Sequence, residues 1–596
     1  MVTRRAGSTA SATLLKLFAL LLALGLVAAA CGGGGDDGGD DGGTATGETD
    51  DGGSGDEGDG EGEGGGTTPT TEPRDEGEPV EGGSITVGLE AESNGWRPGT
   101  ASWASSGYNV AYTVYDPLMA RTAEGEVEPY MAESLEANED FTEFTLTLRP
   151  DVTFHDGTPL DAEAIKSNFD NFLKAPASNL GGVLKNVTAF EVIDELTGKY
   201  VLEEGNAAFP DLLVTAVGMP FSPTAAEEMG EEFNNAPVGT GPYKFVSWQR
   251  DAEFVVERYE DYWGTPGYLD EITFRPIPDE DTRLQSVLSG DIEAFTTLRQ
   301  SIVTQALEAE EQGSIETTLS LGNNGGGAIY NTLIPPVDDP RVRLGLAHAL
   351  NQDDLVAILG GEGITPVRTQ YFEENSPWYS EAVAEAWPAY DPDKSQELLD
   401  EYMNDPERSD GKSPGDPIAV QFNCPPDPSL LELSQAYQSF WSEVGVEVEL
   451  KSVEQAAHIG NAIGSGATDP PFSGEEYMIN CWRMGGEGDP YTTLSIAFGE
   501  VATQPLNFTN YQSDTVDEQL EILRTSADDA ERAAAVEAIG LEFAEQVPNL
   551  WTGGTAVVIG NVPEVNGVGQ WTLTDGTLGS GIADAITRWG QVWIEQ

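Results

Sequence analysis

The sequence has few cysteines, few histidines and few basic residues. Its 596 residues include 3 cysteines, 3 histidines and 28 lysines and arginines, against 103 aspartates and glutamates. The formal net charge of −75 argues against nucleic acid as a partner, because a polyanion repels an acidic surface. The histidines, His155, His348 and His458, lie far apart and lack the spacing of a metal site. No metal and no cofactor are therefore expected.

Nucleotide-binding and catalytic motifs are also missing. The stretch NAPVGTGPYKF, residues 235–245, has glycines followed by a lysine, but Gly239 and Gly241 are two positions apart, whereas a P-loop needs five. Lys244 stands where the third glycine of a dinucleotide-binding loop would be. The stretch predicts a turn that leads into the strand YKFVSW. The sequence shows no Ser-His-Asp order, no nucleophile motif and no spaced metal ligands. An enzyme is therefore not expected.

The N-terminus predicts secretion. Residues 1–30 carry positive charges followed by an apolar run from Leu17 to Ala30, which is typical of a signal peptide. The small residues before Cys31 resemble the lipobox of bacterial lipoproteins, with Ala28 in place of the usual leucine. That resemblance implies lipidation of Cys31 and anchoring to the outer face of the cell membrane. The alternative is an ordinary cleaved signal with an incidental cysteine.

Residues 31–82 predict a disordered tether. From position 32 to 82 the chain has 17 acidic residues, a single basic residue and almost nothing apolar, so it cannot bury a core. Acidic residues are also spread along the rest of the chain. Two explanations of this acidity stay open, namely a salt-adapted surface and attraction of cationic ligands.

The two remaining cysteines, Cys424 and Cys481, both follow strand-like sequences, AVQFNC and EYMINC. In a compartment outside the cytoplasm, a disulfide between them is permitted. We therefore predict that they are bonded, the alternative being two buried thiols.

The body from residue 83 onward is too long for a single hydrophobic core, so two or more lobes are expected. Short β-rich runs mix with amphipathic helical ones, which predicts an α/β or α+β fold. The predicted strands are SITVGLE, FTLTLRP, YKFVSW, EFVVERY, EITFRPI, VEVELKSV and AVVIG. The predicted helices cover residues 341–359, 393–402, 430–444 and 528–546.

The order of these motifs resembles a known family. The runs LTLRPDVTFHDGTPL, PVGTGPYKF, ERYEDYWGTPGYLDEITFRPIP and DDPRVRLGLAHALNQDDLV are similar to those of the family 5 extracellular solute-binding proteins of ABC importers, the dipeptide, oligopeptide and nickel-binding group. The resemblance extends from residue 84 to about residue 556. It implies an α/β bilobal periplasmic-binding-protein-like fold, in the type II, large cluster C form, with an extra β-rich subdomain inserted in the first lobe.

The resemblance also implies how the chain is divided. We expect lobe I to combine three segments, with subdomain II inserted after the first of them and lobe III after the second. The expected boundaries are 83–112 for the first segment of lobe I, 113–234 for subdomain II, 235–320 for the second segment of lobe I, 321–550 for lobe III and 551–596 for the return to lobe I. A ligand would bind between the lobes, and closure would bury it.

In family members that bind peptides, a Gly-Trp pair precedes an aspartate that holds the peptide α-amino group. The matching run here is NCWRMGGEGDP, in which Trp482 aligns with the tryptophan and Cys481 replaces the glycine. Gly485 stands where the aspartate would be, so the usual partner of a free peptide N-terminus is missing. Arg483 offers a guanidinium for an anionic or aromatic ligand, or an ion pair with a neighbouring acid.

Five further residues are expected at or near the ligand. The stretch ESNGWRPGTASW follows the first strand, where the family places residues that line the cleft, and Tyr330 and Asn331 lie near the expected crossover between lobes. Each of these side chains also has a plain packing interpretation. The five residues are Asn94, Trp96, Trp103, Tyr330 and Asn331.

The predicted function is capture of a peptide-like or other small organic solute outside the cytoplasm and its delivery to the permease subunits of an ABC importer in the membrane. The protein is expected to act as a monomer. Two alternatives stay open, namely a ligand-sensing receptor of the same fold and a binder of sugars, opines or metal chelates, because fold does not decide ligand.

Overall fold

The structure is a computed structural model that describes residues 77–596, except positions 102, 175–183, 185, 375, 427, 455–456, 459–460, 463–476, 486–487, 501–506 and 583–584. The predicted signal peptide, Cys31 and the tether up to residue 76 lie outside the described residues. Everything described below belongs to the second of two units into which the chain divides, Thr67–Gln596. No helix in this described part is long and apolar enough to span a membrane.

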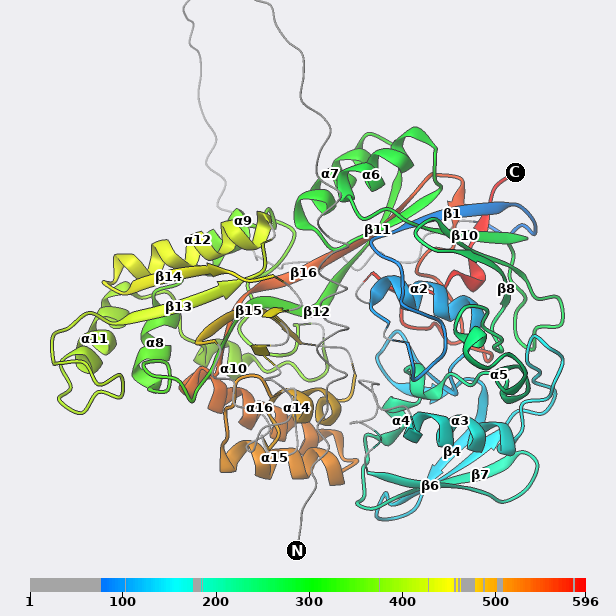
Figure 1. Cartoon of the computed structure of the whole chain (residues 1–596), viewed down its shortest axis with the longest axis horizontal. Helices are drawn as coiled ribbons and strands as arrows, with labels where there is room; N and C mark the ends of the chain where they lie inside the picture. Colours follow the sequence, from blue (N-terminus) through cyan, green and yellow to red (C-terminus); the bar gives the residue numbers. More distant parts are fainter. Residues whose placement is uncertain are drawn as a thin grey trace, which may run out of the picture. The chain divides into compact units, whose positions relative to one another are not determined.

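One ten-stranded sheet runs through the described unit, in the order β14-β13-β15-β12-β16-β11-β1-β10-β9-β8. Long strands β12 (Glu316–Tyr330) and β16 (Asn549–Asn561) form its middle and link two groups of shorter strands (Figure 1). We call the group on the β11 side lobe I and the group on the β15 side lobe III. Lobe I has the strands β1 (Ser84–Leu89), β8 (Tyr243–Gln249), β9 (Glu253–Arg258), β10 (Glu271–Pro276) and β11 (Ala294–Thr297).

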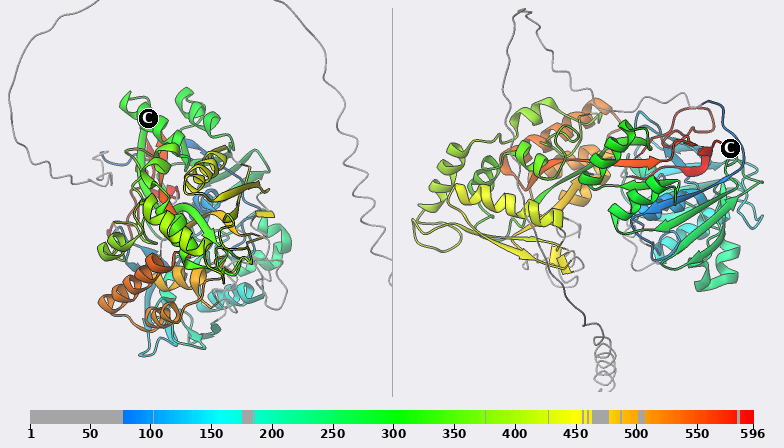
Figure 2. Two further views of the ribbon diagram at one scale, coloured as in Figure 1. Left: turned by 90° about the vertical axis from the view of Figure 1, so that its left-hand side faces the viewer. Right: turned by 90° about the horizontal axis from the view of Figure 1, so that it is seen from above.

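Lobe I is assembled from distant parts of the chain. Strand β1 pairs in parallel with both β10 and β11, and β16 returns from lobe III to pair with β11. The end of the chain lies beside the start of β1, where the Gln596 side chain donates a hydrogen bond to the carbonyl of Glu81 (Figure 2). The remaining elements of lobe I are α2 (Ser105–Val114), α6 (Glu280–Ser289), α7 (Gln300–Glu311), β17 (Val565–Asn566) and β18 (Trp593–Ile594).

A smaller body, which we call subdomain II, has a separate hydrophobic core. Its four-stranded antiparallel sheet has the order β4-β5-β7-β6, and α3 packs against β6. Alternation of buried and half-buried residues along β5 explains this one-sided sheet. The elements are β2 (Met119–Arg121), β3 (Val127–Pro129), β4 (Ala132–Ala137), β5 (Glu143–Leu148), α3 (Ala162–Lys174), β6 (Val187–Val192), β7 (Thr197–Leu202), α4 (Phe209–Leu212) and α5 (Pro223–Met229).

Lobe III surrounds the largest buried apolar cluster of the described residues. Its strands are β13 (Ala419–Cys424), β14 (Glu447–Ser452) and β15 (Ile479–Gly485). Its helices are α8 (Pro340–His348), α9 (Gln352–Ile358), α10 (Glu381–Ala386), α11 (Pro392–Met403), α12 (Pro428–Glu443), α14 (Pro490–Phe498), α15 (Asp514–Thr525) and α16 (Asp529–Gln546).

One predicted helix is wrong in its extent. Residues 341–359 were expected to form a single helix, but α8 ends at His348 and α9 begins at Gln352. Asn351 caps α9, because its side chain accepts a hydrogen bond from the backbone N–H of Asp354. The apolar periodicity continues across this break, so the pattern alone concealed it.

The glycines of PVGTGPYKF serve packing. Gly239 and Gly241 lie against the C-terminal end of α2, where a Cβ on either residue would overlap the backbone of residues 113–115. His155 of the FHDG turn is hydrogen bonded to the carbonyl of Gly241 at 2.9 Å. Burial lowers the pKa of His155 to about 4, so the imidazole is neutral at physiological pH. These two motifs therefore join subdomain II to lobe I.

Candidate functional site

The two long strands change register where they pass between the lobes. Residues 316–322 of β12 pair with residues 555–561 of β16, and pairing resumes at Gly326 after a shift. A second shift follows between Gly326 and Gly327. A Cβ on Gly327 would overlap the carbonyl of Leu550, whereas a Cβ on Gly326 would meet open space. Bulged, glycine-rich crossing strands offer little side-chain resistance to bending, so they are suited to act as a hinge.

A buried ion pair lies against this crossing. Arg368 and Glu373 form it at 2.8 Å, and their side chains are 1% and 8% exposed. The Arg368 guanidinium also lies 5.1 Å from the ring centre of Trp551 in β16. A Cβ on Gly325 would overlap the Arg368 side chain, and one on Gly554 would come to 3.2 Å from Glu373 Oε1. Burial raises the pKa of Glu373, and the charge of Arg368 opposes that rise.

Trp482 stands on β15, the strand of lobe III that borders the crossing. It is half-buried, and it pairs with Gly327, which has no side chain to cover it. The ring of His458 stacks on the indole with centroids 5.6 Å apart and planes inclined by 26°. Phe508 approaches the indole edge-on at 4.7 Å. Trp482 therefore belongs to a small aromatic group whose indole is partly accessible.

Cys481 faces the opposite side of the sheet. A disulfide joins it to Cys424, with Cα atoms 5.1 Å apart, and both residues belong to the buried core of lobe III. Its sulfur is consequently directed away from the face that carries Trp482. The Arg483 side chain lies outside the described residues.

The residues expected at the ligand in lobe I have mainly packing contacts. Trp96 is 3% exposed and packs on Trp248 and Phe254 in the lobe I core, so its contacts in this structure are those of packing. Trp103 is half-buried, donates a hydrogen bond to the carbonyl of Gly95 at 3.0 Å and stacks on Tyr115. Asn94 is exposed, and its carbonyl accepts a hydrogen bond from Arg250.

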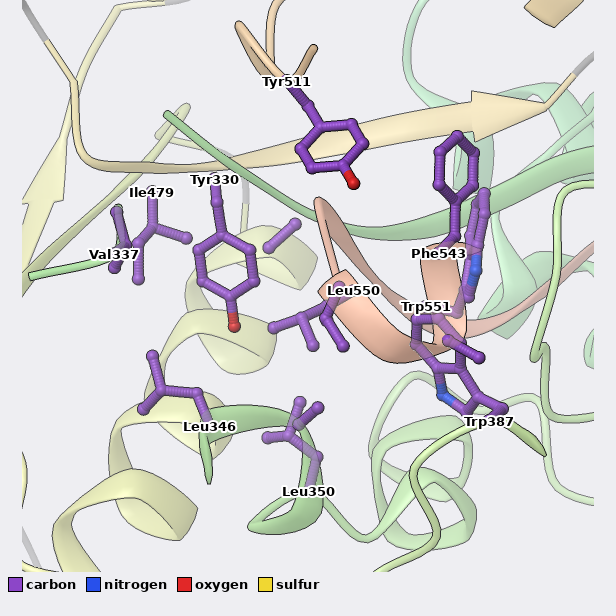
Figure 3. Close-up of a cluster of buried hydrophobic side chains, with 14 of the residues drawn as sticks. Tyr330, Val337, Leu346, Leu350, Trp387, Ile479, Tyr511, Phe543, Leu550 and Trp551 are labelled. Carbon is purple, nitrogen blue, oxygen red and sulfur yellow. The ribbon is translucent and has the colours of Figure 1, made fainter. Parts of the chain in front are cut away.

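Tyr330 and Asn331 are also interior residues. Tyr330 is 0% exposed and points into the lobe III core with Leu346 and Leu550 (Figure 3). Asn331 is 0% exposed, and its side chain donates to the carbonyl of Tyr477 at 3.2 Å and accepts from Asn510. Both side chains lie inside lobe III because β12 ends there, at Tyr330.

The acids near Gly485 do not replace the missing aspartate with a free carboxylate. Asp489 caps α14 by accepting a hydrogen bond from the N–H of Tyr491 at 2.8 Å, and it forms an ion pair with Arg532. Burial raises the pKa of Asp489, and Arg532 opposes that rise. Glu487 lies outside the described residues.

Subdomain II and lobe III touch at a contact that sequence reasoning missed. Asp211 of α4 pairs with Arg121 and also accepts a hydrogen bond from the N–H of Asp489 at 3.0 Å. Gly488 adopts a φ of +125°, and a Cβ there would come to 2.9 Å from the Asp211 carboxylate. We call the contact of Asp211 with Gly488 and Asp489 the interlobe contact.

Further hydrogen bonds join subdomain II to lobe III near the interlobe contact. The carbonyl of Arg524 in α15 accepts a hydrogen bond from the N–H of Ala207 at 2.7 Å, and the Arg524 guanidinium donates to the carbonyl of Gly205. Segment 205–211 of subdomain II therefore docks on the α14–α15 region of lobe III.

Substituting Gly488 with alanine is expected to weaken ligand affinity about tenfold. The added methyl group would strain the backbone and displace Asp211, and a hydrogen bond to a charged group contributes about 1.5–3 kcal/mol. Gly125→Ala is the matched control, since Gly125 has a φ of +90° and a Cβ there would meet nothing within 4 Å. Titration calorimetry of both variants decides the matter, and equal affinities would show that the interlobe contact does not support the bound state.

Within the described residues, no group of three or more histidine, cysteine, aspartate or glutamate side chains is arranged to hold a metal ion. The two lobes have separate cores, and the strands β12 and β16 join them. Lobe III also touches subdomain II at the interlobe contact. This arrangement is that of a clamp-type binding protein.

The chain belongs to family 5 of the bacterial extracellular solute-binding proteins. The family model described as "Bacterial extracellular solute-binding proteins, family 5 Middle" matches residues 126–504. The glutathione-binding protein GsiB of Shigella flexneri is 28% identical over 436 residues, which cover 71% of this chain and 80% of that protein. This chain is accordingly the substrate-binding component of an ABC importer, and its fold is bilobal.

Solved structures show the same fold. The periplasmic binding protein DppA from Helicobacter pylori, in complex with the peptide STSA, is 21% identical with a TM-score of 0.70, and the match covers 87% of this chain and 99% of that one. NikA from Brucella suis, in complex with Fe(III)-EDTA, is 22% identical with a TM-score of 0.72 and coverages of 86% and 100%. One fold thus carries ligands of different chemistry.

Proposed function

We propose that the protein captures a peptide-like or other small organic solute between lobe III and the body formed by lobe I and subdomain II. The observation that carries this proposal is the position of Trp482, half-buried on β15 beside the glycine-rich crossing strands. An accessible indole next to a hinge offers broad apolar contact that changes when the lobes close. The glutathione bound by the GsiB relative and the peptide bound by DppA support a peptide-like ligand.

We further propose that Cys31 carries a lipid that anchors the mature chain to the outer face of the membrane, beside the permease. The acidic tether between Cys31 and the folded body would hold the binding lobes away from an anionic surface.

A thermal-shift panel tests the proposed ligand class. The purified protein is heated with glutathione, trialanine, N-acetyl-trialanine, an opine and Fe(III)-EDTA, each at several concentrations. At a hundred times its Kd, a ligand of the native state stabilises by about 2.7 kcal/mol. We expect at least one of the peptide-like compounds to raise the melting temperature. A rise with Fe(III)-EDTA alone would contradict the proposal and point to a metal chelate.

A further inference from the structure

The inference concerns the side of the aromatic group that faces away from the disulfide, and it rests on the proposed function. Asn480 and Trp482 are two positions apart on β15, so their side chains leave the same face of the sheet. On the neighbouring strand β12, Ile329 pairs with Asn480 and Gly327 pairs with Trp482. This face of the sheet therefore carries the apolar side chain of Ile329 next to the Asn480 carboxamide and the Trp482 indole.

His458 adds a hydrogen-bond acceptor beside Trp482. Its Nε2 lies 3.0 Å from the carbonyl oxygen of Cys481. A carbonyl can only accept, so Nε2 carries the proton and Nδ1 of the neutral ring carries a lone pair. Burial lowers the pKa of His458, although the bond to Cys481 opposes this, so the neutral ring is the form present at neutral pH.

No donor among the described residues reaches this acceptor. His458 is 4% exposed, and its Nδ1 is without a hydrogen-bond partner in the part of the chain that the structure describes. Asn480 is 0% exposed, and neither its Oδ1 nor its Nδ2 has a partner there. A buried polar atom without a partner costs about 1–3 kcal/mol, and each such atom calls for an explanation. One of these residues stacks on the Trp482 indole and the other lies two positions away on the same face of β15, so together they point to a partner that arrives from outside the chain.

We infer that His458 and Asn480 bind an uncharged amide of the ligand beside Trp482, with His458 Nδ1 accepting the amide N–H. The Asn480 Nδ2 group is a donor that complements the carbonyl of the same amide, and Oδ1 is left to accept from a second N–H of the ligand. Because the ligand nitrogen beside Trp482 is an uncharged amide, this end of the site favours a ligand whose N-terminus is acylated.

A free α-ammonium group fits this end of the site poorly. A buried charge needs an opposite charge, and Gly485 has no side chain to provide one. The nearby Asp489 is already paired with Arg532. The overall acidity of the protein would favour a cationic ligand instead, so the two ideas predict opposite preferences.

The test compares trialanine with N-acetyl-trialanine by titration calorimetry of the mature chain. We expect the acetylated peptide to bind at least tenfold more tightly. His458→Phe keeps an aromatic ring on Trp482 but removes Nδ1, so it is expected to weaken binding of the acetylated peptide about tenfold. His348→Phe is the matched control, since His348 lies in α8 and its ring bonds to the carbonyl of Ala389.

Tighter binding of free trialanine, or unchanged binding by His458→Phe, would overturn the inference. Binding of neither peptide, with stabilisation by another solute, would overturn it while leaving the proposed capture of a solute intact. Because the chain has 3 histidines, the wild-type protein labelled with ¹⁵N-histidine gives a readout that needs no variant. The Nδ1 resonance of His458 should move upfield on adding N-acetyl-trialanine, and a resonance that stays in place would also overturn the inference.

Discussion

Trp482→Ala is expected to weaken ligand binding at least tenfold. The indole is half-buried in the free protein, so a ligand that covers the remainder gains apolar burial and aromatic contact. A tenfold loss corresponds to about 1.4 kcal/mol, which is within the range for one aromatic contact together with its buried area. Titration calorimetry with the solute that raises the melting temperature most is the measurement.

The matched control for this prediction is Trp248→Ala. Trp248 is a half-buried tryptophan of lobe I whose indole N–H donates to Glu92 at 2.7 Å, so its loss removes a similar ring away from β15. We expect Trp248→Ala to change stability but not affinity. An unchanged affinity in Trp482→Ala would remove Trp482 from the ligand site.

Arg368→Ala is expected to lower the free energy of unfolding by about 3–5 kcal/mol, since it leaves the buried carboxylate of Glu373 without its ion-pair partner. The guanidinium also donates to the carbonyl of Gln370 at 2.8 Å, so that acceptor loses a donor as well. Urea-induced unfolding followed by tryptophan fluorescence measures the change.

Two further variants separate this effect from a general loss of charge. Lys394→Ala removes one partner of an ion pair with Glu397 whose side chains are 44% and 68% exposed, so its cost should stay below about 1 kcal/mol. The double variant Arg368→Met, Glu373→Leu should recover much of the lost stability, because no buried charge remains. A loss in Arg368→Ala as small as that in Lys394→Ala would show that the buried pair does not stabilise the crossing.

Much of the fold could be predicted from the sequence because it depends on local patterns. Alternating apolar residues and flanking turns gave the strands now seen as β1, β5, β8, β9, β10, β14 and β16. The order of motifs then identified the family, which the comparison with family models confirms. The break between α8 and α9 was missed because the Asn351 side chain caps α9 through one local hydrogen bond, to the N–H of Asp354. Such a cap leaves the apolar periodicity intact.

The site was harder to predict, because its residues meet only in the folded chain. Asp211 and Asp489 are 278 positions apart, and nothing in either local sequence signals their contact. Both Trp96 and Trp482 were expected at the ligand from the sequence. Trp96 fills the lobe I core, whereas Trp482 is half-buried. No sequence motif singles out His458. Its proposed role depends on one ring nitrogen that has no hydrogen-bond partner among the described residues.

Native mass spectrometry of residues 83–596, secreted from cells grown in peptide-rich medium, tests the central claim most directly. The account predicts that the protein retains a small organic molecule, seen either as a ladder of adducts spaced by amino-acid residue masses or as one discrete adduct. It also predicts that Trp482→Ala emerges without the adduct. A wild-type protein that is empty in every preparation, or an adduct that Trp482→Ala retains in full, would contradict capture of such a solute beside Trp482.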